Sequence, residues 1–136
     1  MKTDYLKLYN SLNDEQSMIM RSTNDWVNEH VRPFIENSFN DENPLDLKMK
    51  LADLGAFGPI FSEKYGGLDI DYISFGLMMK ELEKGDSSIR VMSSIQTSLV
   101  MYAIHSFGTE KQKNKYLPKL ASGVLLGSFA MSEPNY

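Results

Sequence analysis

The hydrophobic positions of the chain follow a helical period almost from end to end. Apolar residues recur at helical spacing, and a pattern typical of a short strand appears only near the C-terminus. The sequence therefore predicts five or six helices and an all-α domain. Pro33 removes a backbone donor and is expected to end or kink the first helix. The main expected segments run from Asn13 or Asp14 to Pro33, from Pro44 to Gly55, from Asp71 to Lys84, from Asp86 to Gly108, and from Thr109 to Gly123.

Two of these helices begin with recognisable caps. Asp86 precedes a long uncharged helix, where its carboxylate can accept from the free N–H groups of the first turn. Thr109 and Gln112 have the spacing of a capping box. Residues 56–67, AFGPIFSEKYGG, combine glycine, proline and aromatic residues and predict a packed loop.

The period changes after Gly123. The run VLLGSFAMSEPN is apolar and extended in pattern, and Pro134 with Asn135 predicts a turn. A solitary strand has no neighbour for its ladder hydrogen bonds, so we expect a sheet domain that is cut short. We therefore divide the chain into a helical domain, 1–123, and the first strand of a truncated β-domain, 124–136.

Composition narrows the classes of function. The 136 residues include 14 basic and 18 acidic residues without a basic cluster, which makes nucleic acid a poor partner. The absence of Cys excludes disulfides and thiolate metal sites, and two His are too few for a typical zinc site, so no metal is predicted. The uncharged stretch 87–109 contains Gln96, His105 and many hydroxyl groups, so we expect no membrane insertion. The N-terminus lacks the features of a secretory signal or transit peptide, and a cytoplasmic protein is predicted.

Arg90 is the one cation of the long helix, and it needs an anion. Glu83 and Asp86 lie within reach along the sequence, and spacing alone favours an internal ion pair with one of them. A ligand carboxylate or phosphate remains the alternative, because the guanidinium fork suits both. His105 lacks any accompanying nucleophile and is interpreted as a capping or packing residue. Helical spacing places one small, polar face at Ser87, Arg90, Ser94, Thr97 and Met101, and an expected core face at Met92, Ile95, Leu99 and Tyr102.

Three stretches resemble the acyl-CoA dehydrogenase family. They are FGTEKQKNKYLPKLASG followed by GSFAMSEPN, the YGG loop, and ELEKGDSSIR with the S.Q.SLVM that follows it. The last points to the glutaryl-CoA dehydrogenase branch. The likeness is loose from about residue 13 to 62 and close from there to 135. It implies the N-terminal helical domain of a flavoenzyme whose middle β-domain and C-terminal helical bundle are missing from this chain.

The resemblance also implies roles for individual residues. Arg90 matches the arginine that meets the distal carboxylate of glutaryl-CoA, Glu83 the acidic residue beside it, and Ser94 a serine of the same pocket. Val91 stands where that branch usually has serine. The backbone of Phe129, Ala130 and Met131 and the hydroxyl of Ser132 match the strand that borders the flavin.

The expected activity belongs to the complete enzyme. The family uses FAD to oxidise the Cα–Cβ bond of an acyl-CoA thioester and passes electrons to an electron-transfer flavoprotein, and it usually forms tetramers. The glutaryl branch also releases CO2. The chain ends at Tyr136, where the family continues with a small residue and Gly-Ser-Asp, and it offers no match to the catalytic base. We expect no turnover from these residues alone. The alternatives are a fragment of a short-chain acyl-CoA dehydrogenase, with Arg90 in an internal ion pair, and a non-catalytic helical interaction module.

Overall fold

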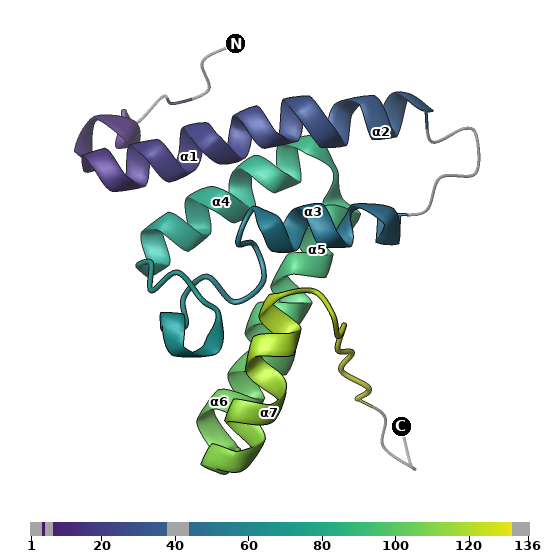
Figure 1. The fold of residues 1–136 in the computed structure, drawn as a ribbon. Helices are drawn as coiled ribbons and strands as arrows, with labels where there is room; N and C mark the ends of the chain where they lie inside the picture. Colours follow the sequence, from purple (N-terminus) through teal and green to yellow (C-terminus); the bar gives the residue numbers. More distant parts are fainter. Residues whose placement is uncertain (1–3, 5–6, 38–43, 132–136) are drawn as a thin grey trace.

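The computed structural model describes residues 4, 7–37 and 44–131 (Figure 1). These residues form an all-α arrangement without a strand, which confirms the expected helical class. Helix α1 (Asp14–Trp26) packs along α4 (Tyr72–Gly85), and α4 leads directly into α5 (Ser87–Ser94). No helix of the described ranges has both the length and the apolar character that a membrane crossing requires. The other helical segments are η1 (Leu8–Ser11), η2 (Val27–Val31), α2 (Arg32–Asn37), η4 (Pro44–Leu47), α3 (Lys48–Asp53), η5 (Glu63–Tyr65), η6 (Ile95–Met101), α6 (Tyr102–Phe107) and α7 (Glu110–Ala121).

The first helix does not end at Pro33. It continues through the π-helical turn η2 into α2, which reaches Asn37. In η2 the N–H of Arg32 bonds to the carbonyl of Val27, so the hydrogen-bond register has already widened before the proline is reached. The helix passes Pro33, which has no N–H to donate, with this wider register. The prediction that the helix ends at Pro33 was wrong.

The predicted caps are present. The Asp86 carboxylate accepts from the N–H groups of Ser88 and Ile89, and thus opens α5. Thr109 and Gln112 form the capping box of α7. Gly123 has a φ of 71° just after α7, a conformation that glycine adopts without strain. These caps fix the start of the helix that carries Arg90 and both ends of α7, which leads to the C-terminal segment.

The faces of the long helix differ from the prediction. Thr97 and Met101 are buried in the protein, whereas Leu99 and Tyr102 lie half-exposed. The cause is η6, which is π-helical and therefore turns by a smaller angle at each residue. Residues after Ser94 are rotated away from the faces that an uninterrupted α-helix would give them.

Two apolar clusters form the core. One lies among α1, η2, α3, α4 and α5. The other is formed by α7, η5, η6 and the loop that precedes η5. Residues 56–61 of the loop are mostly buried between them, which confirms a packed loop. The first cluster is Val27, Val31, Phe34, Leu47, Leu51, Ala56, Phe57, Ile70, Met78, Leu82 and Ile89. The second is Phe61, Tyr65, Met101, Leu117, Leu120 and Ala121.

The segment that follows α7 is not a strand in the structure. Residues 124–131 leave the helical body without a neighbouring strand and are drawn in yellow in Figure 1. Two of their backbone groups, the carbonyl of Leu125 and the N–H of Gly127, bond to a side chain of η6, and the N–H of Leu125 bonds to the carbonyl of Lys119. The division into a helical domain and a truncated β-domain remains a prediction.

Candidate site around Arg90

Glu83, not Asp86, is the carboxylate that meets Arg90. Asp86 uses its side chain to cap α5, whereas Arg90 Nε donates to Glu83 Oε2 at 2.6 Å. Glu83 is near the end of α4 and Arg90 is in the first turns of α5, so the turn between the helices brings the two side chains together. Both remain accessible, with side-chain exposures of 34% for Arg90 and 46% for Glu83.

The Glu83 carboxylate is held from two sides. Besides the bond from Arg90, its Oε1 accepts from the Ser87 hydroxyl at 2.9 Å. The hydrogen bonds from Arg90 and then Ser87 lower the pKa of Glu83 below its ordinary value, because both favour the ionised carboxylate. Glu83 and Ser87 therefore fix one edge of the guanidinium through Nε.

The far side of the guanidinium is less occupied. Nη1 makes a long contact of 3.5 Å to Ser94 Oγ, and Nη2 makes no hydrogen bond within the described residues. Ser94 Oγ in turn donates to the Val91 carbonyl at 3.2 Å. The geometry leaves the Nη1–Nη2 edge of Arg90 with donors for an anion, next to a hydroxyl that can also turn toward it.

The predicted flavin segment is separate from this cluster. Phe129, Ala130 and Met131 are exposed, and their backbone groups make no hydrogen bonds with the described residues. No hydrogen bond or ion pair in the same ranges joins them to Arg90, Glu83 or Ser94. Ser132 lies outside the described residues. The structure thus brings together Glu83, Arg90, Ser94 and the Val91 backbone. Residues 125 and 127, which precede the predicted flavin segment, bond to Gln96 further along the helix that carries Arg90.

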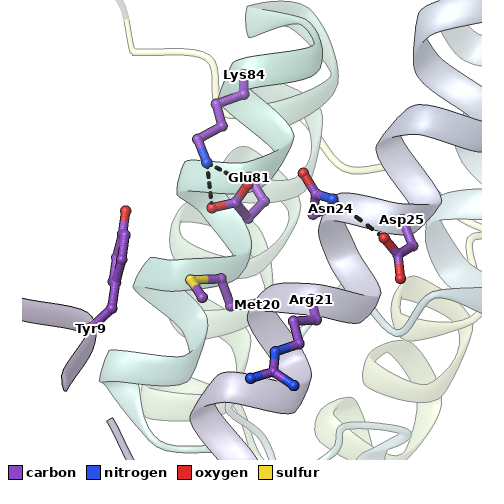
Figure 2. A pocket seen from close by; sticks show the side chains of 7 residues that line it. All are labelled: Tyr9, Met20, Arg21, Asn24, Asp25, Glu81 and Lys84. Carbon is purple, nitrogen blue, oxygen red and sulfur yellow. Dashed lines mark hydrogen bonds and ion pairs between the residues drawn. The ribbon is translucent and has the colours of Figure 1, made fainter. Parts of the chain in front are cut away.

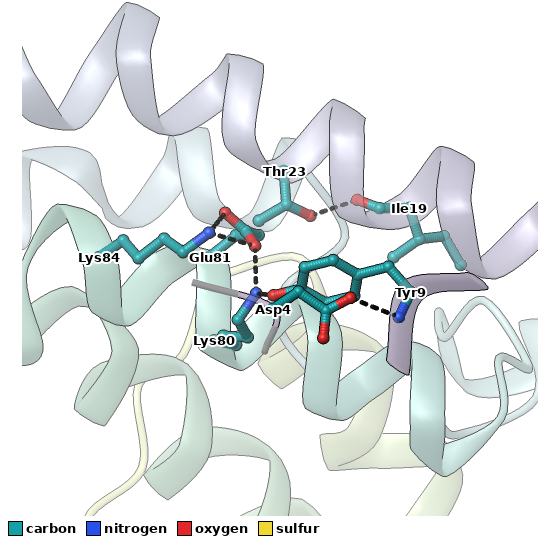
Figure 3. Close-up of polar contacts among 7 residues, drawn as sticks. All are labelled: Asp4, Tyr9, Ile19, Thr23, Lys80, Glu81 and Lys84. Carbon is teal, nitrogen blue, oxygen red and sulfur yellow. Dashed lines mark hydrogen bonds and ion pairs between the residues drawn. The ribbon is translucent and has the colours of Figure 1, made fainter. Parts of the chain in front are cut away.

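A second charged cluster lies on α4. The Glu81 side chain is 3% exposed and receives Lys80 Nζ at 3.1 Å and Lys84 Nζ at 2.6 Å. Figure 3 shows Lys80 also reaching the hydroxyl of Tyr9, whose ring it covers at 4.4 Å from the centroid. Burial opposes the charge of Lys80, but the hydrogen bonds to Tyr9 and Glu81 outweigh it and raise the pKa of Lys80.

A hollow of about 320 Å³ opens beside this cluster (Figure 2). Both Glu81 oxygens are already engaged by lysines, so the carboxylate is committed to the packing of α1, α4 and η1. We interpret the cluster as structural. The hollow is lined by Tyr9, Met20, Arg21, Asn24, Asp25, Glu81 and Lys84.

Sequence reasoning missed part of both clusters. The spacing of Glu83 and Ser87, and of Glu81 and Lys84, places each pair on one helical face and could have shown them. The approach of Tyr9 to Lys80 had no local signal, because it joins distant parts of the chain. His105 lies against the rings of Phe61 and Tyr65, which confirms a packing role.

Other side chains offer no metal centre. Within the described ranges, no group of His, Asp or Glu residues is arranged to hold a metal ion. The arrangement of Glu83, Arg90 and Ser94 can recognise an anion. Apart from this cluster, residues 129–131 present backbone donors and acceptors that have no partner in the described ranges.

Comparison of the sequence with known proteins finds matches to one family. The profile described as acyl-CoA dehydrogenase, N-terminal domain, matches residues 13–124. The probable acyl-CoA dehydrogenase YngJ of Bacillus subtilis is 36% identical over 125 residues, which are 91% of this chain and 33% of that protein.

Solved structures agree in fold. The glutaryl-CoA dehydrogenase of Mycobacterium smegmatis in complex with FADH2 superposes with a TM-score of 0.88 at 32% identity, over 96% of this chain and 34% of that one. The butyryl-CoA dehydrogenase of Megasphaera elsdenii gives 0.79 at 34% identity, over 91% and 33%. The chain thus spans about a third of the length of the relatives it matches.

Proposed function

The chain belongs to the acyl-CoA dehydrogenase family through its N-terminal domain, and from this premise we propose that it serves a flavin-dependent dehydrogenase acting on glutaryl-CoA. The domain would supply one wall of the acyl pocket and one segment of the flavin site. The observation that carries the proposal is Arg90, whose Nε is held by Glu83 while its outer edge retains donors for a second anion.

The geometry suits a dicarboxylic substrate. A carboxylate needs two parallel N–H groups, and the Nη1–Nη2 edge provides them in a fixed fork. Glu83 keeps the fork oriented, and the Ser94 hydroxyl can add a third donor because its present acceptor is only a backbone carbonyl. Val91 contributes its backbone alone, since it has a methyl-bearing side chain where the glutaryl branch usually has a hydroxyl.

The described residues fit a flavin segment. Phe129–Met131 have backbone N–H and C=O groups without partners in the described ranges, as an extended segment needs if it is to bond the edge of a flat ring. When bound, FAD supplies the hydride acceptor for oxidation of the Cα–Cβ bond. This chain's own part is to hold the acyl end through Arg90 and to present the segment, which fixes the substrate relative to the ring.

Several features belong to the complete enzyme that we propose. They are electron transfer to an electron-transfer flavoprotein, assembly into a homo-oligomer, release of CO2 from the oxidised thioester that glutaryl-CoA gives, and a cytoplasmic location. We assign no catalytic base to the residues of this chain, and we propose that it does not turn over by itself.

A second candidate is a dehydrogenase for short, uncharged acyl-CoA substrates. The ion pair between Arg90 and Glu83 favours it, because an internally neutralised guanidinium needs no substrate carboxylate. The likeness to the butyryl-CoA dehydrogenase of M. elsdenii supports this alternative as well. A helical module that only binds a partner is the third possibility, and it would show no catalysis in any completed form.

A chimera separates these candidates. We would join residues 1–136 to the remaining two-thirds of the M. smegmatis glutaryl-CoA dehydrogenase and compare the parent chimera with Arg90→Met. Loss of the fork should lower kcat/KM for glutaryl-CoA by about 100-fold and that for butyryl-CoA by less than about threefold. Ser87→Ala is the graded comparison, because it removes one of the two bonds that hold Glu83 and leaves the bond to Arg90; it should lower kcat/KM for glutaryl-CoA far less than Arg90→Met does. An equal loss for both substrates would exclude carboxylate recognition by Arg90.

A further inference from the structure

Gln96 is a buried amide that holds the C-terminal segment. Its side chain is 1% exposed and lies in the π-helical part of the long helix. Nε2 donates to the carbonyls of Leu120 and Leu125, each at 2.8 Å, and Oε1 accepts from Gly127 N–H at 2.9 Å. One side chain thus joins the end of α7 to the segment that follows it.

The pattern reproduces one residue of a neighbouring strand. In an extended chain, the carbonyl of one residue and the N–H of the residue two positions later point to the same side. A residue of a parallel strand engages such a pair with its own N–H and C=O groups. Gln96 engages Leu125 and Gly127 in this way, so its amide takes the place of a peptide group that no described strand supplies.

Close contact along the helix fixes the segment further. A Cβ built on Gly127 would lie 2.4 Å from Val100 Cγ1, so the backbone of the segment lies directly against η6. Leu125 N–H also bonds to the carbonyl of Lys119 at 2.9 Å. The segment is therefore held at two levels of the helix, beside Gln96 and beside Val100.

The same helix fixes the loop on another face. Ser93 Oγ donates to the Ala56 carbonyl at 2.6 Å, and Thr97 Oγ1 accepts from Gly58 N–H at 2.9 Å. Gln96 stands between these two residues in sequence but points to the C-terminal segment. Gln96 and Thr97 are adjacent in the π-helical part of the helix, yet one bonds to the C-terminal segment and the other to the loop. Arg90 lies on the preceding turns of the same helix.

We propose that Gln96 is a positioning residue that acts as a substitute strand neighbour for residues 125–127 and so places the backbone of residues 129–131 for the flavin. The flavin part rests on the proposed function, whereas the anchoring of the segment does not. Gln96 need not touch either FAD or the substrate. Its effect is on where the segment lies relative to the helix that carries Arg90.

Amide hydrogen exchange of the whole 136-residue chain tests the anchoring. Gln96→Met keeps the length of the side chain but removes its donors and acceptor. We expect exchange of the Gly127 amide to accelerate by at least about tenfold, while the amides of α7 change little. Ser93→Ala is the matched control, since it removes a buried hydrogen bond of the same helix on the loop side and should leave Gly127 protected.

A second variant covers the case in which Gln96→Met does not fold. Gly127→Ala forces a methyl group against Val100, which moves the N–H at position 127 away from Gln96 Oε1 without altering the buried amide. It should accelerate exchange of the amides at positions 125 and 127, the two that are hydrogen-bonded in the parent chain. Unchanged exchange in the variant that folds, or an equal increase in Ser93→Ala, would overturn the proposal.

The flavin part has a separate readout in the chimera described above. Gln96→Met should change the visible absorption and circular dichroism of bound FAD and lower kcat equally for glutaryl-CoA and butyryl-CoA. An unaltered flavin spectrum would overturn this part even if the segment is released. If Arg90→Met shows no preference between substrates while Gln96→Met still perturbs the flavin, carboxylate recognition fails and the role of Gln96 stands.

Discussion

Helix α4 carries two paired carboxylates, Glu81 and Glu83, that have opposite environments. Glu81 is 3% exposed and both of its oxygens are engaged by lysines, which ties it to the packing against η1 and α1 (Figure 3). Glu83 is 46% exposed and accepts from Arg90 through Nε alone. It therefore orients the guanidinium and leaves the Nη1 and Nη2 donors of Arg90 for another partner. The difference separates a pair that maintains the fold from a pair that can serve a ligand.

Replacing each carboxylate with its amide, Glu81→Gln and Glu83→Gln, should give the largest difference between the two residues, and the quantity that differs is the free energy of unfolding. Glu81→Gln leaves Lys80 and Lys84 without a carboxylate at a buried position, and we expect a loss of about 1–2 kcal/mol in the free energy of unfolding. This is less than the cost of breaking a fully buried pair, because both ammonium groups are partly exposed and screened. Urea denaturation followed by circular dichroism measures it.

Glu83→Gln is the control for this experiment, because the pair it breaks is at the surface. Its unfolding curve should be close to that of the parent chain. An equal or larger destabilisation by Glu83→Gln would mean that the Arg90 pair is part of the fold, and the distinction between the two carboxylates would be lost.

The pKa of Glu83 should show a smaller effect. The folded-state pKa of Glu83 is lowered by Arg90 first and Ser87 second, so Arg90→Met should raise it toward its ordinary value. A carboxyl group whose pKa is lower in the folded state stabilises the fold at pH values above its unfolded-state pKa. This stabilisation is lost as the pH falls through its folded-state pKa. The stability difference between the parent and Arg90→Met should therefore narrow below about pH 4.

Carboxyl resonances in NMR titrations measure this directly. Glu110 is the internal control, since its pKa is lowered by Lys64 and Lys113, far from Arg90 in the chain, and should not respond to the substitution. A Glu83 resonance that titrates identically with and without Arg90 would show that the ion pair does not persist in solution.

Local signals in the sequence predicted much of the fold. Caps and glycines located α5 and α7, since Asp86, Thr109 and Gly123 act within one or two turns. The faces of the long helix were predicted wrongly beyond Ser94, because a π-helical register comes from tertiary contacts and has no signature in apolar spacing. Of the two outcomes expected at Pro33, an end of the helix was wrong, because the chain continues through the π-turn into α2, whereas a kink stays a prediction.

The site was partly predictable. Helical spacing offered both Glu83 and Asp86 to Arg90, and only the structure shows that Asp86 is used as the cap. The triple bonding of Gln96 was not predictable, because Leu120, Leu125 and Gly127 are brought to it by the turn after α7. Long-range polar contacts depend on the path of the backbone, which residue spacing does not give.

A double-mutant cycle in the chimera tests the central claim, that Glu83 holds Arg90 so that its free edge can bind the distal carboxylate of a substrate. The measured quantity is the ratio of kcat/KM for glutaryl-CoA to that for butyryl-CoA, for the parent, Glu83→Gln, Arg90→Met and both together. We predict that Glu83→Gln lowers the ratio several-fold when Arg90 is present and leaves it unchanged in the Arg90→Met background. A ratio that falls equally in both backgrounds, or that Arg90→Met does not lower at all, would contradict the account.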